Sequence, residues 1–404
     1  MSAGRIGVAV IGAGMAGRAH AAGYRSARSV AGPDFPDLRL VAVADMHEPF
    51  ATATARRFGF ERAETDWKAV AEAEDIDAVS VVVGNDLHRE VVEGLLAAGK
   101  HVLCEKPLAG RIGDARAMVA AAERADTVAA VGFTFRRSPA INAIRSLIVG
   151  GALGPVRQFS GRYWCDYGCD PAAPMSWRYK GGPGSGALAD VGSHLVDIAE
   201  FLCGSVESVG GTAFATLVTE RPVPTGVVVG HELGEVSDRR EKVENEDVAD
   251  FVATFGKGAV GTLSVSRVAH GTPNAMDFHV SCENGSAGFS LTRPAEFSVF
   301  SASGRADPTG TAGFRRVLIG PQHPYIAGGL PMDAPGVGHG QNDFFSYQAR
   351  AFVQQAAGLP CPDPCPSMAE GLHNLEVLRA VADAAEGGRA SVRVGSARDT
   401  GGGA

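Results

Sequence analysis

The chain has 404 residues, of which 45% are hydrophobic and 20% charged, and its formal net charge is −8. This length and balance allow two ordinary folded domains. The distribution of charge argues against nucleic-acid binding, because Lys and Arg form no cluster that could bind phosphates. The sequence also argues against a membrane span, because no apolar run reaches the roughly 18 to 20 residues required. No apolar signal core follows the first residues, so we expect a cytoplasmic protein.

The first third of the chain alternates short β-branched runs with helical patterns. The helical patterns are Pro49–Phe58, His88–Ala98 and Gly113–Ala125. The strand-like runs are Ile6–Ile11, Leu40–Ala44, Ala78–Val83, His101–Cys104 and Val128–Val131. Such alternation is typical of βαβ units and predicts an α/β fold with a doubly wound parallel sheet, which we assign to residues 1–135.

After residue 135, strand-like runs follow one another with little helix between them. These runs are Val156–Tyr163, Val206–Val218, Val248–Phe255, Ala259–Arg267, Asp277–Cys282, Ser286–Leu291 and Phe297–Phe300. Helical patterns occur at Ser193–Cys203, Asp343–Gln355 and Met368–Ala385. Sequential strands predict a second α/β domain, residues 136–395, with a large, mostly antiparallel open sheet whose free face could serve dimerisation.

Three further segments are interpreted as irregular. Gly-rich and charged stretches at Arg221–Glu246 and Gly320–Gly340 are read as long loops, which are often functional when ordered. The Gly-rich segment 396–404 is expected to be a flexible tail.

A glycine motif follows the first predicted strand. Gly12-Ala13-Gly14-Met15-Ala16-Gly17 fits G-x-G-x-x-G at the start of a helix. The first glycine allows the tight turn, the second lets the backbone approach a pyrophosphate, and the third lets the helix pack close to the strand. Since the motif opens a βαβ series, it predicts dinucleotide binding by Gly12, Ala13, Gly14 and Met15.

An acidic residue ends the next predicted strand. Asp45 can accept hydrogen bonds from the adenosine ribose and would repel a 2′-phosphate, which predicts NAD as the cofactor. The alternative is an ordinary exposed carboxylate at a strand end. The seven cysteines are scattered along the chain, and Cys361 and Cys365 have no second pair or histidine near them in sequence. We therefore expect free thiols and no metal.

Two segments carry side chains suited to proton and hydride chemistry. Glu105 and Lys106 end a buried strand at the edge where such sheets bind ligands, and Lys106 could donate to a reacting oxygen there. The alternative is a surface ion pair. If the segment Gly186–Asp197 is helical, Asp190, His194 and Asp197 share a face, where an imidazole oriented by a carboxylate could take a hydroxyl proton. The alternatives are a structural histidine or a metal ligand.

Taken together, the motifs resemble those of the glucose–fructose oxidoreductase/inositol dehydrogenase/rhizopine-catabolism (Gfo/Idh/MocA) family over essentially the whole chain. The matching segments are Gly12–Gly17, Asn85-x-x-His88, Gly99–Leu108, Gly132–Arg137 and Asp190-x-Gly192-x-His194-x-x-Asp197. One departure is Gly84-Asn85-Asp86-Leu87-His88, where the family usually has Thr-Pro-Asn-x-x-His.

The resemblance implies a role for each matching position. Lys106 would be the catalytic lysine beside the nicotinamide, His194 the proton-transferring residue and Asp190 their partner at the substrate hydroxyl. Cofactor contacts are implied for Asn85, His88, Glu105, Trp177 and Arg178. The resemblance also implies oligomerisation through the second sheet, as a homodimer or homotetramer.

Within the family, several segments look most like those of pyranoside 3-dehydrogenases. This implies oxidation of a secondary hydroxyl, at C3 of a pyranose, in a sugar, glycoside or cyclitol bound between the domains. The expected substrate-binding residues are Arg136, Tyr163, Asp166, Asp190, His194 and His339. Three alternatives stay open: a keto-sugar or aminocyclitol reductase, a redox-neutral enzyme that retains NAD, and a non-catalytic NAD-binding regulator.

Overall fold

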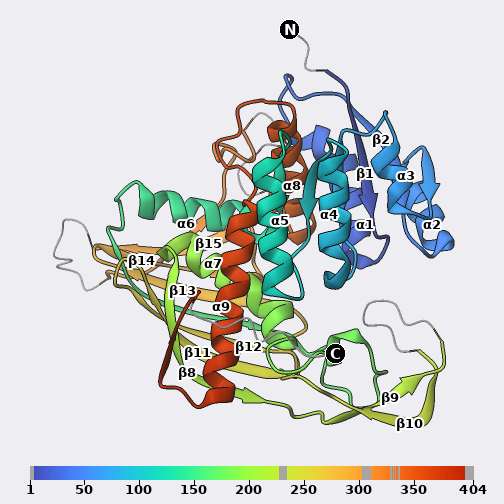
Figure 1. The fold of residues 1–404 in the computed structure, drawn as a ribbon. Coiled ribbons are helices and arrows are strands. Elements are labelled where there is room, and N and C mark those ends of the chain that lie inside the picture. Colours follow the sequence, from blue (N-terminus) through green and yellow to red (C-terminus); the bar gives the residue numbers. More distant parts are fainter. Residues whose placement is uncertain are drawn as a thin grey trace. The chain divides into compact units, whose positions relative to one another are not determined.

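A computed structural model of the chain describes residues 4–226, 234–302, 311–327, 330, 332, 334 and 337–395. The predicted flexible tail 396–404 and part of the predicted loop 320–340 lie outside these residues. The chain divides into two compact units (Figure 1): residues 1–137 with 320–375, and residues 138–319 with 376–404. No helix among the described residues is long and apolar enough to cross a bilayer.

The first unit contains the predicted doubly wound parallel sheet, with strand order β3-β2-β1-β4-β5-β6. Its strands are β1 (Ile6–Ile11), β2 (Leu38–Ala44), β3 (Arg62–Glu64), β4 (Ala78–Val81), β5 (His101–Cys104) and β6 (Ala129–Val131). Its helices are α1 (Met15–Ala27), α2 (Glu48–Phe58), α3 (Trp67–Glu72), α4 (His88–Ala97), α5 (Ile112–Arg124) and α8 (Gln341–Ala356). The order reverses between β1 and β4, the position at which doubly wound sheets bind ligands at their carboxyl edge.

Helices cover both faces of this sheet. On β1, Val8 and Val10 pack with residues of α1 and α8, whereas Ala9 and Ile11 pack with residues of α4 and α5. Because successive strand residues point to opposite faces, this two-sided burial explains why the strands read as continuous apolar runs in the sequence.

The first unit includes residues 320–375, which the division expected from the sequence placed in the second domain. The physical reason is the apolar face of α8. Ala349, Phe352 and Val353 are buried in the same core as Val8 and Tyr24. Local sequence patterns show that such a helix is amphipathic, but not which sheet it covers.

The second unit is built on a nine-stranded sheet with order β16-β15-β14-β13-β7-β12-β11-β8-β17. These strands are β7 (Val156–Trp164), β8 (Val206–Ala215), β11 (Val248–Phe255), β12 (Val260–Ser266), β13 (Ala275–Cys282), β14 (Gly285–Ser290), β15 (Glu296–Ser301), β16 (Arg315–Leu318) and β17 (Ser391–Arg393). Neighbours pair antiparallel except β7 and β12, which are parallel. The mostly antiparallel sheet confirms the prediction.

Helices α6 (Pro139–Val149) and α7 (Ser193–Cys203) pack on this sheet, α6 against β14 and β15 and α7 against β7. On β11, Ala249, Phe251, Ala253 and Phe255 are buried, and the residues between them are exposed. This alternation shows that the sheet is covered on one face in the described unit. The chain passes from the first unit to the second within helix α9 (Met368–Gly387).

The segment 221–246, predicted as one long loop, contains a hairpin. Strands β9 (Glu220–Pro224) and β10 (Val236–Lys242) pair antiparallel, with Glu220 opposite Lys242 and Arg221 opposite Glu241. Their mixture of charged residues hides the alternation of apolar and polar residues from which half-buried strands are recognised.

Candidate active site

The glycine loop between β1 and α1 has the geometry that a dinucleotide requires. Gly12 has φ +101°, and a Cβ there would lie 2.1 Å from the carbonyl oxygen of Val82. A Cβ at Gly17 would lie 1.8 Å from the carbonyl oxygen of Gly12, so no other residue fits at either position. Gly14 is the N-cap of α1, and a Cβ there would meet only open space. The first N–H groups of α1 therefore face a space open to a pyrophosphate.

Asp45 follows β2 and lies beside this loop. Its Oδ2 accepts a hydrogen bond from the N–H of Ala13 (2.7 Å), and its Oδ1 accepts one from the N–H of His47 (2.9 Å). The carboxylate is thus fixed next to the residues that would hold the pyrophosphate. This position fits a group that binds the adenosine ribose and repels a 2′-phosphate.

Replacing Asp45 by Asn is expected to lower the preference for NADH over NADPH by about tenfold or more. The negative charge that repels a 2′-phosphate is lost, while the amide oxygen can still accept from Ala13. The measurement is the Kd of each reduced cofactor by fluorescence titration. Asp37→Asn, an exposed carboxylate paired with Arg28, is the control and should leave the ratio unchanged. An unchanged ratio in Asp45→Asn would contradict the assignment.

Glu105 and Lys106 follow β5 at the same edge of the sheet. The Glu105 side chain is 12% exposed, and its Oε1 lies 2.8 Å from Nε2 of His20. Its Oε2 accepts a hydrogen bond from the backbone N–H of Lys106 (3.2 Å). Burial raises the pKa of Glu105, but the interactions with His20 and with Lys106 outweigh this effect, so the pKa lies below its usual value. The carboxylate therefore stays ionised beside the half-buried Lys106.

Asn85 and His88, two of the predicted cofactor contacts, lie in the segment after β4. Asn85 opens a short 3-10 turn and is half-buried. His88 is fully buried, and its ring nitrogens lie 3.1 Å from the carbonyl oxygens of Val83 and Leu108. Burial lowers the pKa of this imidazole. His88 thus joins the loop after β4 to the loop that follows Lys106 and supports the cofactor edge from within.

In the second unit, Asp190 and His194 come from one continuous helical segment, as predicted. Residues 188–192 form a π turn, and α7 begins at Ser193. Both side chains are half-buried, whereas Asp197 is 2% exposed. The hydroxyl of Tyr167 donates to Oδ2 of Asp190 (2.7 Å). Tyr167 thus fixes this carboxylate from a neighbouring loop.

Tyr163, predicted to bind substrate, lies beside His194. Their ring centroids are 6.2 Å apart, and the Tyr163 hydroxyl donates to Oδ1 of Asn274 (2.8 Å). Burial raises the pKa of the Tyr163 phenol well above its usual value, so the hydroxyl stays protonated. Asp166, on the loop after β7, is half-buried. The second unit thus brings Tyr163, Tyr167, Asp190 and His194 into one group.

Two predicted substrate residues lie in the first unit. Arg136 Nη1 donates to Oε1 of Glu370 (2.7 Å), and its guanidinium lies 5.8 Å from the ring centroid of Phe133. His339 is 8% exposed, with its ring centroid 6.3 Å from that of Phe344. A large part of Arg136's charge is therefore balanced within its own unit.

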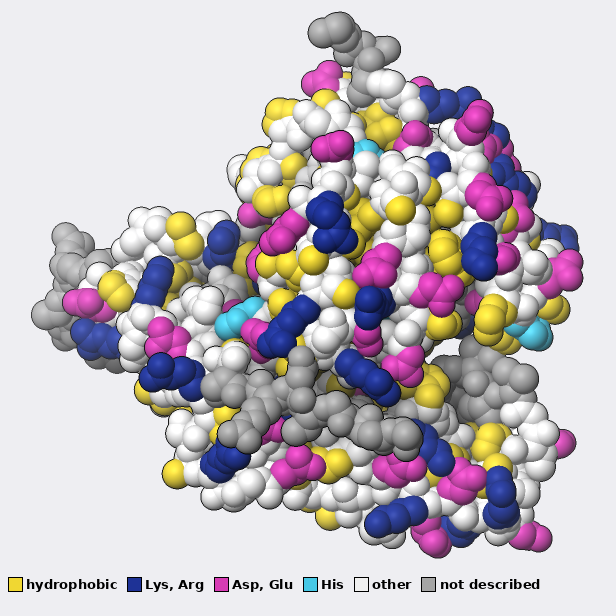
Figure 2. Space-filling view, in the orientation of Figure 1, with side chains coloured by type: hydrophobic (Ala, Val, Ile, Leu, Met, Phe, Trp, Pro, Cys, Tyr) yellow, Lys and Arg dark blue, Asp and Glu magenta, His cyan; other side chains and the backbone are white. Residues whose placement is uncertain are grey.

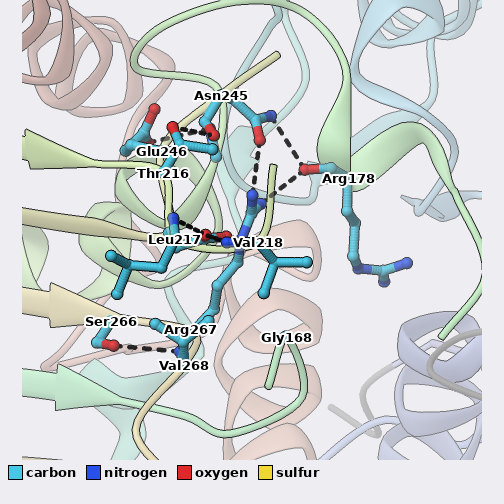
Figure 3. Close-up of polar contacts among 12 residues, drawn as sticks. Gly168, Arg178, Thr216, Leu217, Val218, Asn245, Glu246, Ser266, Arg267 and Val268 are labelled. Atoms are coloured by element: carbon cyan, nitrogen blue, oxygen red, sulfur yellow. Dashed lines mark hydrogen bonds and ion pairs between the residues drawn. The ribbon is translucent and has the colours of Figure 1, made fainter. Parts of the chain in front are cut away.

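The Trp177–Arg178 pair lies on an ordered loop of the second unit. Trp177 is 64% exposed, and the guanidinium carbon of Arg178 lies 4.4 Å from the Trp177 ring centroid. The carbonyl oxygen of Arg178 accepts hydrogen bonds from Nδ2 of Asn245 (3.0 Å) and Nη1 of Arg267 (2.9 Å). Figure 3 shows that the Arg178 side chain points away from these contacts, so the cluster holds this segment through its backbone.

Four buried side chains form what we call the anchor cluster: Asn245, Glu246, Asp247 and Arg267. All three guanidinium nitrogens of Arg267 donate hydrogen bonds. Nε donates to Oδ1 of Asp247 (2.7 Å), Nη1 to the carbonyl oxygen of Arg178, and Nη2 to Oδ1 of Asn245 (2.8 Å). Arg267 and Asp247 are both fully buried, so their charges compensate each other out of water (Figure 3).

The acidic members of the anchor cluster hold further backbone segments. Glu246 accepts from the N–H groups of Gly184, Gly186 and Leu188, which lead into the π turn that carries Asp190. Asp247 Oδ2 accepts from two N–H groups after β8, those of Leu217 and Val218. The cluster thus fixes both the Trp177–Arg178 loop and the start of the Asp190 segment. The feature of the sequence that indicates this cluster is three consecutive polar residues, 245–247, directly before an apolar strand.

Two further features, the surface charge and possible metal ligands, do not help to locate the site. On the face shown in Figure 2, Lys and Arg side chains are interspersed with Asp and Glu. Among the described residues, no group of three or more His, Cys, Asp or Glu side chains is arranged to hold a metal ion. Among the described residues, the cysteines form no disulfide.

Residues 6–133 match the oxidoreductase family with an NAD-binding Rossmann fold known as Gfo/Idh/MocA, and residues 141–288 match the C-terminal domain of the same family. Together with the glycine loop and the Asp45 carboxylate, these matches define an NAD-dependent oxidoreductase. The chain belongs to the Gfo/Idh/MocA family.

Named relatives agree with this assignment. Levoglucosan dehydrogenase of Pseudarthrobacter phenanthrenivorans is 36% identical over 352 residues, which cover 84% of this chain and 88% of that enzyme. D-glucoside 3-dehydrogenase of Escherichia coli is 32% identical over 55% of this chain and 61% of that enzyme. The solved structure of levoglucosan dehydrogenase in complex with NADH and levoglucosan has a TM-score of 0.86 at 31% identity and covers 97% of this chain and 100% of that chain. The predicted family, fold class and cofactor are thereby confirmed.

Proposed function

We propose that this enzyme oxidises a secondary hydroxyl of a sugar, glycoside or cyclitol to a ketone, at C3 where the substrate is a pyranose. The observation that carries the proposal is its likeness, over nearly the whole of both chains, to a dehydrogenase solved with NADH and levoglucosan. The glycoside 3-dehydrogenase among the relatives supports C3 as the position.

The proposed chemistry uses three side chains to which the family resemblance assigns roles. The His194 imidazole accepts the hydroxyl proton, because an imidazole exchanges protons near neutral pH. The Lys106 ammonium stabilises the negative charge that develops on the oxygen. Asp190, itself held by Tyr167, orients the imidazole. When bound, NAD supplies the acceptor for the hydride that leaves the carbon.

The proposed substrate contacts follow from the same arrangement. Tyr163 is the best supported, because its ring lies beside His194. Asp166 and His339 offer further polar contacts to a polyol. For Arg136 the support is weaker, because its guanidinium already donates to Glu370. We place Trp177 and Arg178 beside the nicotinamide.

The test is the absorbance of NADH at 340 nm with purified protein, NAD and a panel of sugars, glycosides, cyclitols and aminoglycosides. We expect turnover with levoglucosan or a simple glycoside, and a 3-keto product by NMR. Turnover only in the reverse direction would favour a keto-sugar reductase, which the similarity to 1,5-anhydro-D-fructose reductase of Ensifer adhaerens makes the second candidate. NAD that co-purifies and does not exchange would favour a redox-neutral enzyme.

We also propose assembly as a homodimer or homotetramer through the nine-stranded sheet. The exposed face of β11 and β12 carries Val252 and Val260, which are 37% and 45% exposed. Apolar side chains on an open sheet face are suited to a symmetric contact. The cytoplasm is the proposed compartment, since it supplies NAD.

A further inference from the structure

A line of four polar side chains runs through the first unit and ends at the Glu105 carboxylate. The Tyr24 hydroxyl lies 2.8 Å from Oγ of Ser80, which lies 3.0 Å from Nδ1 of His20. His20 Nε2 in turn lies 2.8 Å from Oε1 of Glu105. Tyr24 and His20 come from α1, and Ser80 from β4. These three residues are 2%, 3% and 0% exposed, so each depends on the others for its hydrogen bonds.

The direction of these hydrogen bonds follows from the phenol at the far end. Burial raises the pKa of Tyr24 far above its usual value, so the phenol keeps its proton. Among the described residues, Ser80 is the one hydrogen-bond partner of this hydroxyl. A buried phenol proton without an acceptor is unfavourable, so Tyr24 donates to Ser80. Ser80 then donates to Nδ1 of His20, and Nε2–H of His20 donates to Glu105.

This direction assigns a neutral imidazole with its proton on Nε2. If His20 were doubly protonated, Nδ1 would donate to Ser80, and either the phenol proton of Tyr24 or the hydroxyl proton of Ser80 would lack an acceptor among the described residues. Glu105 accepts at the end of the line, and its pKa below the usual value keeps it a carboxylate. Its second oxygen accepts the N–H of Lys106. Both oxygens are therefore held by groups of known position.

The groups that face this carboxylate come from several elements. His20 belongs to α1 and Lys106 follows β5. His88, at the start of α4, lies near enough for the Glu105 charge to influence its pKa. Cys104 ends β5, and burial raises the pKa of its thiol, which keeps it uncharged. The edge of the His20 ring meets Phe345 of α8, with centroids 5.4 Å apart. Among these groups, His20 is the side-chain donor in direct contact with Glu105.

We propose that His20 is a positioning residue of the cofactor edge, which acts through Glu105. It keeps the carboxylate ionised and oriented to accept hydrogen bonds from a ribose, next to Lys106. The same helix, α1, presents the glycine loop at its N-terminus, so His20 joins the pyrophosphate-binding and ribose-binding parts of the site. The role in turnover rests on the proposed dehydrogenase activity, whereas the role in cofactor binding does not.

The test is the Kd of NADH from pH 5.5 to 8.5, measured by fluorescence titration for His20→Leu and His20→Gln. In His20→Leu the buried carboxylate loses its donor and takes up a proton at higher pH. We expect its NADH affinity to fall by up to about tenfold per pH unit below the raised pKa of this carboxyl, with a much flatter profile in the parent protein. In His20→Gln the amide N–H can replace Nε2–H without titrating, so the flat profile should return.

A matched control separates positioning from stability. His101→Leu removes an imidazole at the other end of β5, where Nδ1 accepts the N–H of Val128 (3.0 Å). It should lower the melting temperature and leave the pH profile of NADH binding unchanged. A parent-like profile in His20→Leu, or a His20→Gln profile that matches His20→Leu, would overturn the proposal. Because the readout is NADH binding, a failure of the proposed sugar oxidation would be seen separately.

Discussion

Replacing Lys106 by Ala is expected to lower kcat by roughly two to four orders of magnitude, the range in which one positioned proton-transferring or charge-stabilising group contributes. Lys106 lies at the carboxyl end of β5, beside the ionised Glu105. Without its ammonium group, the charge that develops on the substrate oxygen has no cation from this edge. The Kd of NADH should change little, because the glycine loop, Asp45 and Glu105 remain. Steady-state rates and fluorescence titration measure the two effects separately.

Two variants make this result specific. Lys106→Arg keeps a positive charge on a longer, planar group and should recover part of the rate. Lys100→Met is the matched control: Lys100 is 8% exposed, and its Nζ donates to the carbonyls of Ala73 and Ile76. It should reduce stability and leave kcat nearly unchanged. Near-normal turnover in Lys106→Ala would remove this residue from the proposed chemistry.

Replacing Arg267 by Met is expected to lower the free energy of unfolding by about 3–5 kcal/mol, the range measured when one partner of a buried ion pair is removed. Asp247 would keep its two backbone donors but lose its counter-charge in a fully buried position. The carbonyl of Arg178 would also lose one of its two donors. Denaturant unfolding of the second unit, followed by tryptophan fluorescence, measures the change.

The size of this effect should depend on burial and on the shape of the guanidinium. Arg267→Lys keeps the charge but cannot fill three hydrogen bonds in one plane, so it should recover only part of the stability. Arg162→Met is the control, because Arg162 forms a half-exposed pair with Asp277 across β7 and β13. Exposed pairs contribute little. A loss in Arg267→Met no larger than in Arg162→Met would contradict the role of the anchor cluster.

The parts of the fold that local patterns determine were predicted closely. Ile6–Ile11, His101–Cys104 and Ser193–Cys203 form elements with the predicted bounds. Buried parallel strands are short apolar runs between turn residues, and a helix within a mostly β region has a distinct period. The glycine loop was also recognisable in the sequence, because Gly12 and Gly17 stand where no other residue fits.

Relationships between distant segments were not predictable in the same way. In the sequence, His20 looks like an ordinary helix residue. In the fold, its Nε2 lies 2.8 Å from Oε1 of Glu105. Asn245, at the end of a charged segment, acts on a loop more than sixty residues earlier in the chain. Each of these contacts joins residues that are far apart in the sequence, and a single sequence does not show which distant residues meet.

The division of the first unit into 1–137 and 320–375 has a consequence for biosynthesis. When the ribosome has completed the sixth strand, one face of the sheet still lacks the buried residues of α8, such as Phe352 and Val353. That apolar face stays open until nearly the whole of the second unit has been translated. The nucleotide-binding half is therefore completed late in synthesis, and a fragment that stops at residue 137 would expose part of its own core to water.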